Sequence, residues 1–251
     1  MLQDPFFWLA AIIAVSVVGI GKGGFVGLGV LGTPILALVM SPVQAAAILL
    51  PILCLQDIVT MAAYRGSFDR RILVISLAGA MIGTLGGYLL ASTVTDAHVR
   101  LIVGLVAVAF AANWWIGVAQ RRALGPKPGP VAGVVWGTIA GFTSFVSHAG
   151  GPPFQFYVLP QRLERDALVG TTAWFFAILN AVKLIPYAAL GEFDATNLTL
   201  SAALAPVAIL STMAGVWLVR RIETERFYKI VYTLLVLVGV KLVYDGLTAI
   251  L

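Results

Sequence analysis

The sequence predicts an all-α, polytopic membrane protein with two inverted repeats, each a glycine-broken helical hairpin followed by three transmembrane helices. Hydrophobic residues make up 60% of the 251 residues and charged residues only 11%. Ordinary soluble domains are about 45–50% apolar and about 25% charged. Apolar runs of membrane-spanning length recur along the chain. Two further apolar regions, one in each half, are interrupted by glycine-rich breaks.

The apolar segments fall into two kinds. One kind has about 20 residues, enough to cross a bilayer as a helix, and comprises 43–64, 72–91, 99–119, 167–190, 195–219 and 227–249. The other kind forms broken pairs, 6–20 with 24–40 and 130–147 with 152–160. The breaks are "GKGG" at 21–24 and "SHAGGPP" at 147–153. The sequence leaves open whether the hairpin arms cross the membrane or re-enter part-way.

The two halves share an order of segments and short identities. A Gly-x-Phe-Asp pattern at 66–69 recurs at 191–194, and a Gly-Gly pair at 23–24 recurs at 150–151. Internal symmetry of this kind is typical of transporter folds. We therefore expect one transporter domain over 1–251, with repeats at about 5–119 and 130–249 joined by a cytoplasmic connector at 120–129.

Loop charges predict the orientation of the chain. Lys and Arg gather in four regions, at 65–71, 121–127, 162–165 and 220–229. Cytoplasmic loops carry an excess of these residues, so we place all four regions in the cytoplasm. The acidic "GEFD" at 191–194 then lies outside, whereas its counterpart "GSFDRR" lies inside. The halves are therefore inverted, and both termini are expected to be extracytoplasmic.

Other classes of function find little support. The net charge of +5 is assigned to cytoplasmic loops rather than to nucleic acid, because no basic run alternates with exposed aromatic residues. Cys54 is the sole cysteine, so it forms no internal disulfide. Two distant histidines and one cysteine indicate no metal site. A dinucleotide-type glycine pattern at 19–24 lacks the acidic residue that would follow it. No cofactor and no catalytic residue are predicted.

Broken helices in inverted repeats predict a substrate site near the membrane midplane, where the hairpin tips meet. The expected substrate-binding residues are Lys22, Gly23, Gly24, Ser147, His148, Gly150, Gly151 and Gln155. Free N–H groups at helix starts favour anions. Lys22 adds a full positive charge and His148 adds a titratable donor. An oxyanion suits such a set.

Several of these residues also have a simpler interpretation. Lys22 could extend to the membrane surface and act only in topology. His148 could hydrogen-bond a carbonyl within the helix break. Glycines in membrane helices often mark close packing, which is the preferred interpretation for Gly27, Gly29 and Gly32.

Polar residues also lie inside two long helical segments. Gln56 and Asp57 fall within 43–64, and Asn180 and Lys183 fall within 167–190, at similar depths. Charges at such depth are costly and indicate function, so these four residues are candidates for coupling or gating. Two alternatives stay open: Asp57 pairs with Lys183 across the repeats, or Asp57 carries a proton while Lys183 attracts the anion.

Three stretches resemble the TauE/SafE sulfite exporter family: "GIGKGGFVGLGVLGTPILALVMSPVQAAAILLPILCLQD" at 19–57, "GFTSFVSHAGGPP" at 141–153 and "RRIETERF" at 220–227. The resemblance implies a bacterial inner-membrane carrier that exports sulfite or a small organosulfur anion such as sulfoacetate. Import of an organosulfonate is the alternative. The implied partners are a small anion and the lipid bilayer, and a homodimer is left open.

Two rival classes compete with a carrier. A sulfur-transfer enzyme would be expected to use reactive cysteines, but Cys54 lies alone in an apolar segment. A scaffold or sensor would not need mirrored breaks with polar residues at depth. The sequence therefore favours a transporter over an enzyme.

Overall fold

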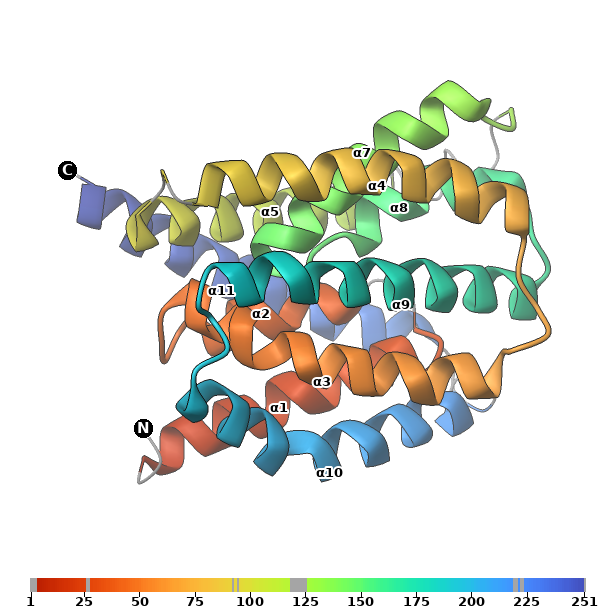
Figure 1. The fold of residues 1–251 in the computed structure, drawn as a ribbon. Helices are drawn as coiled ribbons and strands as arrows, with labels where there is room; N and C mark the ends of the chain where they lie inside the picture. Colours follow the sequence, from red (N-terminus) through yellow and green to blue (C-terminus); the bar gives the residue numbers. More distant parts are fainter. Residues whose placement is uncertain are drawn as a thin grey trace.

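The computed structural model describes residues 4–25, 28–91, 93, 95–117, 126–218, 221 and 224–250, without the side chains of 224–231 and 234. Every regular element in this described part is helical (Figure 1). The predicted all-α class is thus confirmed. Gly27, most of the connector with Arg121 and Arg122, and Arg220 lie outside the described residues.

Six long helices occupy the segments predicted to span the membrane. They are α3 (Pro42–Ala63), α4 (Arg70–Ala91), α5 (Asp96–Ile116), α9 (Arg165–Ala189), α10 (Ala195–Leu218) and α11 (Thr224–Ile250). Within the described residues, seven helices are long and apolar enough to cross a membrane: α1, α3, α4, α5, α7, α9 and α10. The chain is therefore a multi-pass membrane protein.

The two predicted broken pairs each have one long and one short arm. The first consists of α1 (Pro5–Lys22), the 3-10 helix η1 (Leu28–Leu31) and α2 (Gly32–Leu36). The second consists of α7 (Pro130–Ser147), α8 (Gly151–Val158) and the 3-10 helix η2 (Leu159–Gln161). The long arms α1 and α7 have 18 residues each, or about 27 Å at 1.5 Å per residue. The eight-residue α8 spans only about 12 Å, too short to cross a hydrocarbon core of about 30 Å.

Helix packing relates the two halves. Helix α1 packs along α10, α4 packs along α7, α3 packs against α9, and α5 packs against α11. By their order in the chain, the counterparts are α1 and α7, α3 and α9, α4 and α10, and α5 and α11. When each helix is replaced by its counterpart, the α1–α10 pair becomes the α7–α4 pair. The α3–α9 and α5–α11 pairs stay the same. An inverted repeat would produce this exchange of partners, although the repeat itself stays a prediction.

Small residues bring the paired helices into backbone contact. A Cβ added to Gly23, just after α1, would lie 2.3 Å from the backbone nitrogen of Val216 in α10. One added to Gly83 in α4 would lie 1.9 Å from the carbonyl oxygen of Thr138 in α7. Membrane helices associate through such close packing because lipid offers no hydrophobic driving force between them.

The ends of the helical bundle differ in charge. Both termini and the turn between α9 and α10, which contains Glu192 and Asp194, lie at the left in Figure 1. The turns from α3 to α4 and from α8 to α9, which contain Arg65 and Arg162, lie at the opposite end. This separation agrees with the predicted topology; which end faces the cytoplasm stays a prediction.

Candidate functional site

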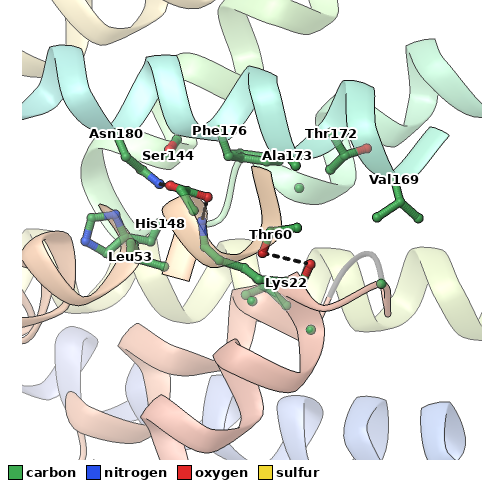
Figure 2. Close-up of a pocket in the computed structure, with 16 residues that line it drawn as sticks. Lys22, Leu53, Thr60, Ser144, His148, Val169, Thr172, Ala173, Phe176 and Asn180 are labelled. Carbon is green, nitrogen blue, oxygen red and sulfur yellow. Dashed lines mark hydrogen bonds and ion pairs between the residues drawn. The ribbon is translucent and has the colours of Figure 1, made fainter. Parts of the chain in front are cut away.

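A pocket lies where the two helix breaks meet, between α1 and α3 on one side and α9 on the other (Figure 2). We call it the site pocket. Lys22 and Gly24 line it from the first break, and His148 and Gly151 line it from the second. Its volume is about 70 Å³. The sequence-predicted meeting of the two breaks is therefore present in the structure.

Lys22 points into the protein rather than toward a surface. It is the last residue of α1, where a cation is favoured by the negative end of the helix dipole. Its ammonium group forms an ion pair with one carboxylate oxygen of Asp57 in α3. The side chain of Asn180 in α9 donates to the other oxygen at 2.7 Å. The Lys22 and Asp57 side chains are only 14% and 4% exposed, so the surface-extension alternative does not describe this lysine.

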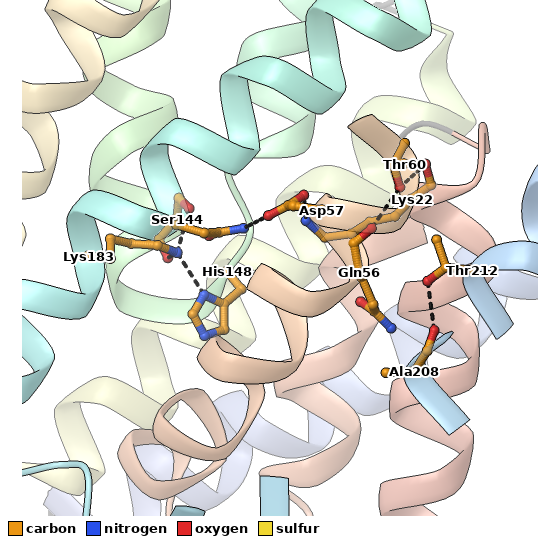
Figure 3. A network of polar contacts seen from close by, with 10 residues as sticks. Lys22, Gln56, Asp57, Thr60, Ser144, His148, Lys183, Ala208 and Thr212 are labelled. Atoms are coloured by element: carbon orange, nitrogen blue, oxygen red, sulfur yellow. Dashed lines mark hydrogen bonds and ion pairs between the residues drawn. The ribbon is translucent and has the colours of Figure 1, made fainter. Parts of the chain in front are cut away.

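A second polar cluster surrounds Lys183, which is fully buried in α9 (Figure 3). Its ammonium nitrogen lies 3.0 Å from both the carbonyl oxygen and the hydroxyl of Ser144. It also lies 2.9 Å from Nδ1 of His148. The other ring nitrogen, Nε2, is 2.9 Å from the carbonyl oxygen of Ala46 in α3. Because a carbonyl only accepts, these partners assign a neutral imidazole with its proton on Nε2.

The two clusters together contain two lysines but only one carboxylate among the described residues. Among the residues described around the site pocket, Lys22 and Lys183 face a single carboxylate, that of Asp57. The described acceptors of Lys183 are all neutral. The proposed pairing of Asp57 with Lys183 is not formed, because Lys22 and Asn180 occupy both carboxylate oxygens. Burying an ammonium group without a counter-charge is costly, so a small anion in the pocket would stabilise the charged form of Lys183.

The second break brings a helix start to the pocket. Helix α8 begins at Gly151, which lines the site pocket. Helix N-termini carry partial positive charge and unpaired N–H groups that suit anions. Pro152 and Pro153 have no N–H group, so the donors remaining in this first turn belong to glycine. Glycine also keeps this backbone open to close approach.

At the first break, the described residues present the opposite end of a helix to the pocket. This break presents the C-terminal end of α1, so the expectation of a helix start at both breaks is met only at the second. The N–H groups of Gly23 and Gly24 cap the helix by donating to the carbonyls of Gly19 and Gly21, at 3.0 and 3.2 Å. Gly24 has φ of 145°, which side chains other than hydrogen rarely allow. The favourable charge at this break therefore comes from Lys22.

Four sequence-predicted residues lie outside the lining of the site pocket. Ser147 donates to the carbonyl of Thr143 at 3.2 Å. Gly150 packs against α7, since an added Cβ would lie 2.6 Å from the carbonyl of Ala140. The amide nitrogen of Gln155 is buried without a described partner. Gly23 packs on α10. The contacts of Ser147, Gly150 and Gly23 position the breaks around the pocket.

The predicted coupling residues divide in the same way. Asp57 and Asn180 line the pocket, whereas Lys183 lies directly behind His148 and Ser144. Gln56 donates to the carbonyl of Val15 at 3.2 Å and so ties α3 to α1. Gln56 is therefore a structural contact rather than part of the pocket lining.

Two of the glycines assigned to packing differ from each other. An added Cβ on Gly32 would lie 2.5 Å from the side chain of Val18, as packing requires. Gly29 lines the site pocket, and an added Cβ there would meet nothing within 4 Å. The packing interpretation is thus supported for Gly32, whereas Gly29 leaves space in the pocket.

Several pocket residues were missed by the sequence analysis. Thr60 of α3 and Thr172 of α9 supply hydroxyls, and the ring centroid of Phe176 lies 5.9 Å from the Lys22 nitrogen, within cation–π range. Helical spacing from Asn180 to Phe176 and Thr172 was the signal that could have found them. Arg100 was also missed; it donates to the carbonyl of Ala37 at 2.8 Å, just after α2.

Comparison with known proteins identifies the family of the chain. The family model described as "Sulfite exporter TauE/SafE" matches residues 10–242, a range that includes both breaks and every residue of the site pocket named above. No curated protein and no solved structure gives a significant match. The family is one of transporters, not of enzymes. The chain therefore belongs to the TauE/SafE sulfite exporter family, whose members are membrane transporters of sulfite or related anions.

Proposed function

We propose that this protein exports sulfite, or a closely related small organosulfur anion, across the bacterial inner membrane, and that the site pocket holds the anion during transport. The observation that carries the proposal is the presence of two largely buried lysines and a single described carboxylate at the meeting point of two broken helices. Lys22 and Lys183 are opposed by one carboxylate, and the N-terminus of α8 adds further positive potential.

The size of the pocket fits a small guest. A buried water requires roughly 10–15 Å³ by the measure that gives the pocket about 70 Å³. The pocket therefore has room for several waters or for an anion of a few heavy atoms. Lys22 supplies the charge, and Thr60, Ser144 and Thr172 place polar hydroxyl groups at its wall. Such a site binds an oxyanion without any bond-making chemistry.

Membrane energetics favour export of such an anion. Moving one elementary charge through the membrane potential changes the free energy by about 2.3 kcal/mol per 100 mV. A doubly charged sulfite leaving a negative interior would gain about 4.6 kcal/mol per 100 mV. Outward movement therefore requires no coupling ion, whereas uptake of the same anion would require one. Alternating access between two inverted halves supplies the movement.

The decisive experiment is sulfite flux into proteoliposomes of the purified protein with an imposed membrane potential. We expect potential-driven movement that is lost in Lys22→Ala and His148→Ala. The matched control is Lys241→Ala, because Lys241 is an exposed lysine that pairs with Asp245 at 2.9 Å, outside the pocket lining. If both pocket variants fold and transport at the wild-type rate, the site assignment is wrong.

Competing anions decide the substrate and the direction. Sulfate, thiosulfate and sulfoacetate are added in parallel with sulfite. Movement of an organosulfonate without movement of sulfite would change the substrate and keep the site. Uphill uptake driven by an ion gradient would favour the importer alternative. If no anion moves under any gradient, the proposed transport function fails.

A further inference from the structure

A second cavity lies beyond His148, on the side away from Lys22. Its volume is about 150 Å³, and α3, α4, α5, α7 and α9 contribute its lining. The lining is largely apolar and includes Ala46, Phe145 and Tyr187, with Glu192 as its charged member. We call it the second cavity. It shares no lining residue with the site pocket.

The same faces of two helices line both cavities. Along α9, Val169, Thr172, Phe176 and Asn180 line the site pocket, and Tyr187 and Leu190 line the second cavity. Along α3, Leu53, Asp57 and Thr60 line the site pocket, and Val43 and Ala46 line the second cavity. These spacings of three, four and seven residues define one stripe on each helix. The site pocket therefore follows the N-terminal half of α9, and the second cavity follows its C-terminal end.

Only a thin barrier separates the two cavities. His148, which lines the site pocket, bonds through Nε2 to the carbonyl of Ala46, which lines the second cavity. The hydroxyl of Tyr187 donates to the carbonyl of Phe145 at 2.7 Å, and both residues line the second cavity. Lys183 lies on the α9 stripe between Asn180 and Tyr187 and contacts His148. The two linings are thus joined by the His148–Ala46 contact, with Lys183 beside it.

Charge at the mouth of the second cavity is negative. Glu192 lies in the turn after α9, beyond the end of the helix. Its pKa is raised by burial and then by the neighbouring carboxylates of Asp96 and Asp194. Carboxylates here would repel an anion that crosses this mouth in either direction.

We propose that the second cavity is the other half of the transport path, and that the His148–Ala46 and Tyr187–Phe145 contacts form the gate that closes it in this structure. The inference rests on the proposed carrier function and adds the route and the gate. The site pocket offers the anion Lys22 and the gate opens beside Lys183. A small anion is then never far from a buried ammonium group along the path.

The experiment measures the reactivity of cysteines placed in the second cavity. Cys54→Ser provides a cysteine-free background, since Cys54 is the sole cysteine. Val43→Cys and Ala91→Cys introduce thiols from two different helices of the lining. Leu89→Cys is the matched control, because Leu89 is on the same helix as Ala91 but 62% exposed on the surface of the bundle and outside the lining. The probe is a membrane-impermeant, anionic methanethiosulfonate applied to proteoliposomes of one orientation.

We expect both second-cavity thiols to react at least tenfold faster than the Leu89→Cys control, from the side of Glu192 only, and their adducts to block flux. Tyr187→Phe removes the bond to Phe145 and should admit the anionic probe to a Ser144→Cys thiol from that side at least threefold faster. Thiols as inert as the control, adducts that leave flux unchanged, or no effect of Tyr187→Phe would overturn the path.

The two proposals fail in different ways. If the second-cavity thiols react and Tyr187→Phe opens access, but neither sulfite nor an organosulfonate moves, the gated access route stands and the proposed function fails. If sulfite flux is normal and depends on Lys22, but the thiols at positions 43 and 91 are inert, the proposed function stands and the path is wrong.

Discussion

Replacing Asp57 with asparagine should make the site pocket bind anions more tightly. In the structure, the Asp57 carboxylate holds the Lys22 ammonium group and accepts from Asn180. It thereby occupies the cation that a substrate needs, and it repels any anion in the same pocket. Asparagine keeps the shape of the side chain, and Asn180 can rotate its amide to present oxygen to the new amide group.

The expected gain follows from the charge removed. Two unit charges about 8 Å apart interact by about 2 kcal/mol at an effective dielectric constant of about 20, and an anion in the pocket that Asp57 lines would be repelled by at least that much. Each 1.4 kcal/mol is about a tenfold change in affinity, so sulfite binding should strengthen about 30-fold. Because the Asp57 side chain is only 4% exposed, the gain should persist at high salt.

The assay is sulfite titration of the detergent-purified protein by calorimetry, with thermal stability measured in parallel. Lys22 loses its counter-charge in the empty Asp57→Asn protein, and breaking a buried ion pair costs about 3–5 kcal/mol. Bound sulfite should restore that stability, so its thermal shift should exceed the wild-type shift. Lys22→Met should abolish binding. Asp245→Asn is the matched control, because it neutralises an exposed carboxylate that also pairs with a lysine.

Weaker or unchanged sulfite binding in a folded Asp57→Asn protein would refute this reasoning. It would show that the carboxylate assists binding, as a proton carrier or through an ordered water, rather than competing for Lys22. Normal binding by Lys22→Met would go further, because the anion would then occupy a different place.

Three further predictions concern packing, the buried cation and the cavity mouth. Gly83→Ala should destabilise the protein by about 1–3 kcal/mol, because the added methyl group overpacks against α7. Gly86→Ala on the same helix has open space around it, so it should be neutral or stabilising by up to about 1 kcal/mol. Thermal unfolding in detergent compares the two variants. Lys183→Met should lower sulfite flux at least tenfold in protein that still elutes as a single species, and full flux would show that the second cation is dispensable. Glu192→Gln should lower the sulfite KM for entry from its own side several-fold at low ionic strength, with the difference vanishing at high salt; a KM change equal on both sides would contradict a local charge effect.

Much of the fold could be predicted because membrane insertion imposes simple local rules. Long apolar runs must become helices, since every backbone polar group needs a partner inside the chain. The starts of three helices are marked by proline at their first position, Pro5, Pro42 and Pro130. The two breaks were also visible, because paired glycines beside a lysine or a histidine interrupt an otherwise apolar run and favour a turn over a continuous helix.

The site was only partly predictable. Lys22 and His148 were identified because a charge or a titratable group at membrane depth is conspicuous. Gln155 and Ser147 were chosen for their chemistry alone, and the structure places them outside the pocket lining. Thr172 was overlooked because a threonine in a membrane helix is not conspicuous without knowledge of which face it occupies.

The sequence by itself determined that the chain is a helical membrane protein with two interrupted hairpins and a few polar groups at depth. Only the tertiary structure decided which groups pair. Lys22 meets Asp57 across 35 residues and Asp57 meets Asn180 across 123, and no local pattern links positions so far apart. Helical periodicity fixes which residues share a face, but packing of one helix on another fixes which faces meet. The choice of Lys22 over Lys183 as the partner of Asp57 therefore belongs to the fold.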